Sequence, residues 1–245
     1  ILSDPSHQNT LSEKMIDELQ SAFDHFNSSP SRVIILSSTG KVFSAGHDLK
    51  ELKAARSHPD KGKEYFQSIL KKCSRLMQTI VNHSKPVIAQ VDGVATAAGC
   101  QLALSCDLVY ASSNSRFATP GVNIGLFCST PMVALSRNTT SKHSMEMLLT
   151  GELISADEAE KKGLINKSVN EEELENLILE KANKISSKSG TTLKIGKKAF
   201  YQQIEMPLAE AYEYASKVML ENMLDQDAKE GIEAFLEKRS PNWKE

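Results

Sequence analysis

The stretch from Val91 to Gly125 constrains the fold of this chain more than any other. A strand ends near Val91, small residues at 95–99 follow a turn at Asp92-Gly93, and a short apolar run at 102–104 comes next. The first N–H groups of a helix have no partner within the helix, and the helix dipole favours negative charge there. Small side chains let a ligand approach those amides closely. This order of strand, small-residue turn and short helix predicts an α/β fold with an anion or oxyanion site at the turn.

An earlier segment repeats this design. A strand at 33–36 leads to the small-residue corner Ser44-Ala45-Gly46 and then to an expected helix start. Two such corners can offer two backbone amides to one oxygen atom, as an oxyanion hole does. Small residues between a strand and a helix also serve as plain packing corners, so the pattern alone leaves both interpretations open.

Three ordered motifs and a fourth segment carry a resemblance to a known family. Their residue ranges are Phe43 to Lys50, Gly93 to Asp107, Phe117 to Gly125 and Leu148 to Val169. The first three are similar to F-x-A-G-x-D-[IL]-K, G-x-A-x-G-G-G-x-x-[LI]-A-x-x-x-D and F-x-x-P-E-x-x-x-G. The last is similar to L-T-G-x-x-[IL]-x-A-x-x-A-x-x-x-G-L-V. On these motifs the chain resembles the crotonase (enoyl-CoA hydratase/isomerase) superfamily over nearly its whole length.

The resemblance implies a spiral of repeated ββα units with a C-terminal helical region that mediates trimers. The sequence pattern is compatible with this fold, because no strand pattern remains beyond about residue 170. We therefore expect a core at 1–170 and a helical region at 171–245. In the family other strands precede the one that ends at Ile1-Leu2-Ser3, so we expect upstream residues that include any targeting peptide.

The C-terminal helical region also predicts self-association, as a trimer or a pair of trimers. Its apolar positions exceed what a lone surface helix needs. They are Leu208, Ala211, Ala215, Met219 and Met223.

The resemblance also implies the site. The backbone amides of His47 and Ala98 would polarise the carbonyl of an acyl-CoA thioester, which would be the ligand; no other cofactor is expected. The substrate-binding positions would be Ala45, Gly46, Asp48, Lys50, Gly99 and Cys128. Other roles stay open for three of them: Asp48 as a helix cap, Lys50 as a solvated surface charge and Cys128 as a small apolar filler.

The chain departs from the family at the groups that transfer protons. Family hydratases use two glutamates about twenty residues apart, and these positions hold Gln101 and Gly121 here. Glutamine can hydrogen-bond a water molecule but cannot accept its proton at neutral pH. Glycine is expected to leave only space. We therefore assign no catalytic residue and expect little or no enoyl-CoA hydratase activity.

Three functions remain. The first is an acyl-CoA-binding protein of fatty-acid and lipid metabolism that keeps the oxyanion hole without hydratase activity. The second is an active enzyme of the superfamily with different acyl-CoA chemistry, such as a hydrolase, a decarboxylase or an atypical isomerase. The third is a regulatory or interaction scaffold. An intact pair of oxyanion amides favours the first two, and the missing carboxylates favour the first.

The amino-acid composition limits the classes of partner that the chain is expected to bind. The 29 Lys and Arg nearly balance the 31 Asp and Glu, so no field for nucleic acid or a membrane surface is indicated. No apolar run is long enough to span a bilayer. The four cysteines show no metal-binding spacing, which favours a reducing intracellular compartment. The resemblance implies a mitochondrial location.

Overall fold

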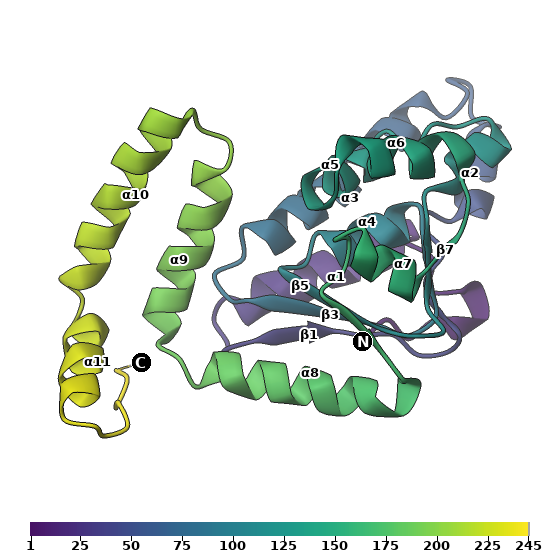
Figure 1. The fold of residues 1–245 in the computed structure, drawn as a ribbon. Coiled ribbons are helices and arrows are strands. Elements are labelled where there is room, and N and C mark those ends of the chain that lie inside the picture. Colours follow the sequence, from purple (N-terminus) through teal and green to yellow (C-terminus); the bar gives the residue numbers. More distant parts are fainter. Residues whose placement is uncertain (245) are drawn as a thin grey trace.

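The computed structural model describes residues 1–244, and alternate strands of the chain build two four-stranded sheets (Figure 1). The first sheet, in spatial order, consists of β1 (Ile34–Leu36), β3 (Val87–Val91), β5 (Leu108–Ser112) and β8 (Lys167–Val169). The second consists of β2 (Val42–Ser44), β4 (Val94–Thr96), β6 (Arg116–Ala118) and β7 (Ile154–Ser155). Neighbouring strands are parallel except β6 and β7.

Helices follow successive pairs of strands. The helices of the core are α1 (Glu13–Phe26), α2 (Leu49–Ala55), α3 (Lys63–Val81), α4 (Ala98–Leu104), α5 (Pro131–Asn138), α6 (Ser141–Thr150) and α7 (Ala156–Lys161). Two 3₁₀ turns, η1 (Pro5–His7) and η2 (Pro120–Ile124), join them. The repeated order of two strands and a helix confirms the expected spiral of ββα units, a crotonase-type fold.

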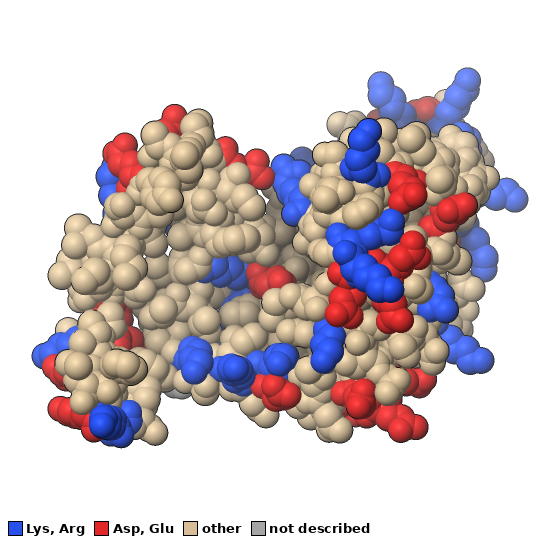
Figure 2. Space-filling view, in the orientation of Figure 1, with Lys and Arg blue, Asp and Glu red and all other residues tan. Residues whose placement is uncertain are grey.

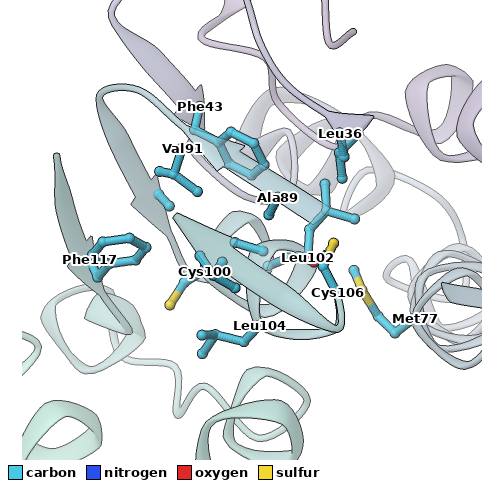
Figure 3. Packing of buried hydrophobic residues seen from close by; sticks show 14 of the residues in the cluster. Leu36, Phe43, Met77, Ala89, Val91, Cys100, Leu102, Leu104, Cys106 and Phe117 are labelled. Carbon is cyan, nitrogen blue, oxygen red and sulfur yellow. Dashed lines mark hydrogen bonds between the residues drawn. The ribbon is translucent and has the colours of Figure 1, made fainter. Parts of the chain in front are cut away.

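The short helix α4 lies at the centre of the core. All seven of its residues are buried. In Figure 3 its residues Cys100, Leu102 and Leu104 pack among strand residues that include Phe43 and Phe117. Because every face of α4 is covered by protein, its position relative to both sheets is fixed, and so is the turn that precedes it.

Four helices follow the last strand. They are α8 (Glu171–Ser186), α9 (Gly190–Gln203), α10 (Leu208–Met223) and α11 (Gln226–Leu236). Helix α8 covers the first sheet, where Leu174 and Ile178 pack against Ile88 and Tyr110. Helices α9 to α11, which we call the C-terminal arm, extend away from the core (Figure 1).

The sequence predicts one long final helix that is interrupted near Asp225, and the structure has two helices there. The Asp225 carboxylate accepts a hydrogen bond from the Asp227 amide at 2.8 Å and caps α11, so α10 ends before it. The sequence also predicts a last strand at 163–169, but only Lys167–Val169 pairs with β5.

The surface of the arm differs from that of the core. On the face in Figure 2, charged residues of both signs are interspersed over the core, whereas the arm shows broad uncharged areas. Large apolar side chains are exposed along the arm, among them Leu208, Tyr212, Met219, Leu224 and Phe235. Among the described residues no helix is both long and apolar enough to cross a membrane.

A buried histidine, His83, is expected to make the stability of this fold depend on pH. The ring of His83 is held by the Phe23 carbonyl oxygen at 3.1 Å from Nε2 and by the Lys85 amide, which donates to Nδ1 at 3.1 Å. Burial lowers the pKa of His83 against the hydrogen bond to the Phe23 oxygen, which raises it, and the charges of Lys197 and Lys85 lower it further. The folded state therefore favours the neutral ring more than the unfolded state does.

We expect the free energy of unfolding to fall as the pH drops below about 6.5. In this range His83 binds a proton in the unfolded state but not in the folded state. Urea unfolding between pH 5 and 7.5 measures this slope. His83→Gln should flatten the slope, whereas His58→Gln, at an exposed position, should leave it unchanged. Identical slopes for His83→Gln and the unmodified chain would contradict the prediction.

Candidate functional site

The two small-residue corners are in direct contact. Gly46 has a φ of +86°, and a Cβ atom placed on it would lie 3.0 Å from the amide nitrogen of Ala98 and 3.0 Å from Ala97 Cβ. The backbone of the first corner therefore lies against the beginning of α4. A side chain at residue 46 would be strained by the backbone conformation and would crowd the Ala98 amide.

Gly99 makes the second close approach. A Cβ atom there would lie 2.1 Å from the Ser44 carbonyl oxygen, so the backbones of α4 and β2 touch. Both glycines are thus required by packing. This packing role is compatible with oxyanion binding, because it places the first corner against the Ala98 amide.

Neither expected oxyanion amide has a partner within the described part of the chain. Ala98 is the first residue of α4, so its N–H has no acceptor within the helix. No backbone acceptor outside α4 takes it up, and the same holds for the N–H of His47. An unpaired amide beside the core needs an acceptor, which a ligand oxygen can supply.

A helix follows the first corner, as expected, and Asp48 lies between the corner and the helix. Helix α2 begins two residues after His47, because the Asp48 carboxylate accepts hydrogen bonds from Lys50 N at 2.7 Å and Glu51 N at 3.4 Å. The Leu11 amide donates to the Gly46 oxygen at 2.8 Å and holds the chain extended. The structure shows Asp48 as a helix cap, and the His47 amide belongs to the segment before the cap.

Ala97 takes up the strain at the second corner. Its φ of 50° and ψ of −121° lie in a region that residues with a Cβ atom rarely adopt. Its N–H donates to the Ala118 oxygen at 3.0 Å, and its own oxygen accepts from Gln101 N at 3.0 Å. Strained backbone of this kind is held in place by its surroundings and gathers at functional sites.

The two positions that hold glutamates in family hydratases, residues 101 and 121, have different surroundings in this chain. Gln101 is 5% exposed, and its side-chain oxygen is buried without a hydrogen-bond partner. Gly121 does not leave free space, contrary to expectation. A Cβ atom on it would lie 2.7 Å from the Leu126 oxygen and 2.9 Å from Cys128 Sγ. The thiol of Cys128 fills this position and accepts a hydrogen bond from the Gly121 amide at 3.3 Å.

Burial shifts the pKa of His47 and that of Cys128 in opposite directions. Burial lowers the pKa of the His47 ring, which contacts the Leu11 oxygen through Nδ1 at 3.3 Å and leaves Nε2 buried without a partner. Burial raises the pKa of the Cys128 thiol above its ordinary value. Both shifts favour the uncharged form of the side chain, the neutral imidazole and the thiol.

The remaining predicted residues lie around the corners in different surroundings. Ala45 donates its amide to the Gln8 oxygen at 3.2 Å, and Lys50 is exposed on α2. The cavity of about 260 Å³ between α1, α2 and α3 is lined by Glu13, Glu51, Ala54, Ala55, His58 and Tyr65, none of them a corner residue. No group of acidic, histidine and cysteine residues within 1–244 is arranged to hold a metal ion.

Sequence reasoning missed Thr119. It follows the last residue of β6 and is 1% exposed, and its hydroxyl oxygen is buried without a partner. A polar residue directly after a short strand was the available signal. That strand has only three residues, too few to be recognised by alternation.

Comparison with known proteins agrees with this geometry. A family model described as Enoyl-CoA hydratase/isomerase matches residues 1–245. Enoyl-CoA hydratase domain-containing protein 3, mitochondrial, of Mus musculus is 50% identical, over 99% of this chain and 80% of that protein.

Solved structures give the same result. The crystal structure of human enoyl Coenzyme A hydratase domain-containing protein 3 is 49% identical, has a TM-score of 0.93, and matches over 98% of this chain and 93% of that chain. An enoyl-CoA hydratase structure from Mycobacterium smegmatis is 46% identical with a TM-score of 0.93, over 98% and 92% of the two chains. Motifs, fold and both kinds of comparison lead to one conclusion: the chain belongs to the enoyl-CoA hydratase/isomerase family.

Proposed function

We propose that this protein binds acyl-CoA thioesters, serves fatty-acid or lipid metabolism, and has little or no enoyl-CoA hydratase activity. The observation that carries the proposal is the contact between the two corners. The amide of His47 lies beside the first corner and that of Ala98 lies in the second, and neither has a hydrogen-bond acceptor in the described chain. A thioester oxygen between them would receive both hydrogen bonds. Such preorganised donors favour an oxygen that carries or develops negative charge.

The surroundings of the corners support the second half of the proposal. Gln101 cannot exchange a proton at neutral pH, and Cys128 fills the position of the second family glutamate. A missing acid or base lowers the rate by about 10²–10⁴-fold for each positioned group. Since both glutamates of the family hydratases are replaced here, hydration of an enoyl thioester should be very slow.

The test measures binding and turnover on the same sample. We expect butyryl-CoA to bind in isothermal titration calorimetry. We expect crotonyl-CoA to be hydrated at least about 10²-fold more slowly than by an ordinary hydratase of the family. Hydration at an ordinary rate would contradict the loss of activity. Absence of binding to every acyl-CoA would favour the scaffold function instead.

Two variants of one residue separate the backbone donor from its side chain. His47→Ala keeps the amide, so the affinity for butyryl-CoA should stay nearly unchanged. His47→Pro removes the N–H and should weaken binding at least tenfold. Circular dichroism of both variants controls for folding. Equal affinities of the two folded variants would show that the thioester oxygen is bound elsewhere.

Restoring the hydratase needs more than two substitutions. Gln101→Glu with Gly121→Glu would place the second side chain against the Leu126 oxygen and Cys128 Sγ. We therefore propose that activity returns only if the segment around Cys128 is changed as well.

We further propose that the chain assembles as a trimer or a pair of trimers in mitochondria. The exposed apolar side chains of the C-terminal arm support the first part, and the printed names of the relatives support the second. Recovery of the native protein outside mitochondria in cell fractionation would contradict the location.

Sedimentation should give three or six times the chain mass of 27.0 kDa at micromolar concentration. Leu224→Glu with Phe235→Glu should shift the species towards the monomer, because both side chains are more than three-quarters exposed on the arm. Leu179→Glu, on the exposed face of α8, is the matched control and should keep the assembly. A monomeric unmodified chain would refute the proposal.

A further inference from the structure

The chain folds back along α11 where that helix ends. Lys238 has a φ of 55°, a left-handed conformation that often reverses a chain after a helix. Residues 239–244, which we call the tail, then contact α11 first at Glu230 and further back at Asp227. Figure 1 shows the tail between α11 and the start of α9.

The tail attaches α11 to the turn between α8 and α9. Trp243 Nε1 donates to the oxygen of Ser187, the residue that ends α8, at 2.8 Å. The same indole ring lies against α11, where a Cβ atom added to Gly231 would be 3.2 Å from it. One side chain of the tail thus joins α8 to α11.

A buried carboxylate makes a second attachment. Asp227, in the first turn of α11, is 2% exposed. Its Oδ1 accepts from the Lys244 amide at 2.8 Å, and its Oδ2 accepts from the hydroxyl of Ser189, which caps α9. The tail and the start of α9 therefore hold the beginning of α11 through the two oxygens of one carboxylate.

The local sequence does not force the break between α10 and α11. Sharp bends in helices usually occur at Pro or Gly, and residues 222–230 contain neither. The Asp225 cap favours the break, but it is a single interaction. A continuous helix would pair the amides of residues 226–228 with the carbonyl oxygens of residues 222–224. Contacts from outside the two helices therefore decide between a break and a continuous helix.

We propose that the tail is a latch that holds the break between α10 and α11, and that its opening joins the two helices into one. In this step the hydrogen bonds of Trp243 and Asp227 to the turn between α8 and α9 are lost, and the intrahelical bonds of residues 226–228 replace them. The side chains of Phe235 and Leu236, 83% and 73% exposed, move with α11. The latch thus sets which apolar surface the C-terminal arm presents.

Two measurements test the latch, because Trp243 is the single tryptophan of the chain and residues 226–228 have amides that only a continuous helix pairs. Asp227→Ala removes the acceptor of both Ser189 and Lys244. In this variant acrylamide should quench the tryptophan fluorescence at least about twofold more strongly, and the amides of residues 226–228 should exchange with solvent at least about tenfold more slowly. Trp243→Phe, a milder change that removes the indole N–H, should slow the exchange in part.

Asp157→Ala is the matched control, because Asp157 also lies in the first turn of a helix, α7 of the core, and is exposed. It should change neither measurement, and circular dichroism checks that all variants are folded. Faster exchange of residues 226–228 in the two tail variants overturns the latch, because the tail would then only stabilise α11. Unchanged exchange overturns it too, whether or not Trp243 is released, since the break would then persist without the tail. Neither outcome bears on the proposed function, because acyl-CoA takes no part in the test.

Discussion

Gly99→Ala should lower the free energy of unfolding by about 3 kcal/mol or more and reduce the affinity for acyl-CoA at least tenfold. The added methyl carbon would stand 2.1 Å from the Ser44 carbonyl oxygen and 2.7 Å from its carbonyl carbon. These are backbone atoms of β2, so no side-chain rotation relieves the overlap, and overpacking of this kind costs about 1–3 kcal/mol or more. Separation of β2 from α4 also moves His47 away from Ala98.

Chemical denaturation and titration with butyryl-CoA measure the two effects. Gly196→Ala is the matched control, because Gly196 is an exposed helical residue with no atom within 4 Å of an added Cβ. This control should gain up to about 1 kcal/mol, since alanine is the better helix former. If Gly99→Ala were as stable as the unmodified chain, the described contact between the corners would be wrong.

Lys197→Met should destabilise the protein by about 3–5 kcal/mol, because it leaves a buried carboxylate without its cation. The Lys197 ammonium donates to Asp107 Oδ2 at 2.7 Å and to two backbone oxygens, those of Ile80 and Lys85, at 3.1 Å each. The lysine side chain is 8% exposed and that of Asp107 is 16% exposed. Burial lowers the pKa of Lys197, although the charge of Asp107 opposes this shift.

The same carboxylate joins three parts of the fold. It accepts from Val87 N at 2.7 Å on β3 and from the Tyr201 hydroxyl at 3.0 Å on α9. Lys197→Met therefore weakens the attachment of the C-terminal arm to the core as well. Thermal and urea unfolding should both report the loss.

Two variants test whether the unpaired charge of Asp107 causes the loss of stability in Lys197→Met. Lys217→Met removes a cation from an exposed pair with Glu213, about 70% exposed on both sides, and should change stability by less than about 0.5 kcal/mol. Adding Asp107→Asn to Lys197→Met removes the uncompensated charge and should recover part of the loss. A double variant less stable than Lys197→Met would indicate that packing, not charge, dominates.

Helical periodicity and capping residues predicted several elements correctly. The spacing of Met15, Leu19, Ala22 and Phe23 predicts α1, in which Leu19 and Phe23 are buried together with Ile16, which the pattern did not include. Of the two expected caps, Thr10 and Ser12, it is Ser12 that accepts from Met15 N at 3.2 Å. These features depend on neighbours within four residues, so the sequence displays them directly. The strands β2, β4 and β6 have three residues each and show no alternation, so they were not predicted.

The sequence by itself determined the resemblance to the family, which implies the ββα spiral, and the absence of carboxylates at residues 101 and 121, because motifs depend on residue identity at a fixed spacing. Only the tertiary structure decided what surrounds them. It closes the space at Gly121 with a thiol from seven residues later, and it pairs Asp107 with a lysine 90 residues away. It also leaves Gln101 and Thr119 buried without partners. Such contacts join segments whose separation along the chain carries no local signal, so only packing fixes them.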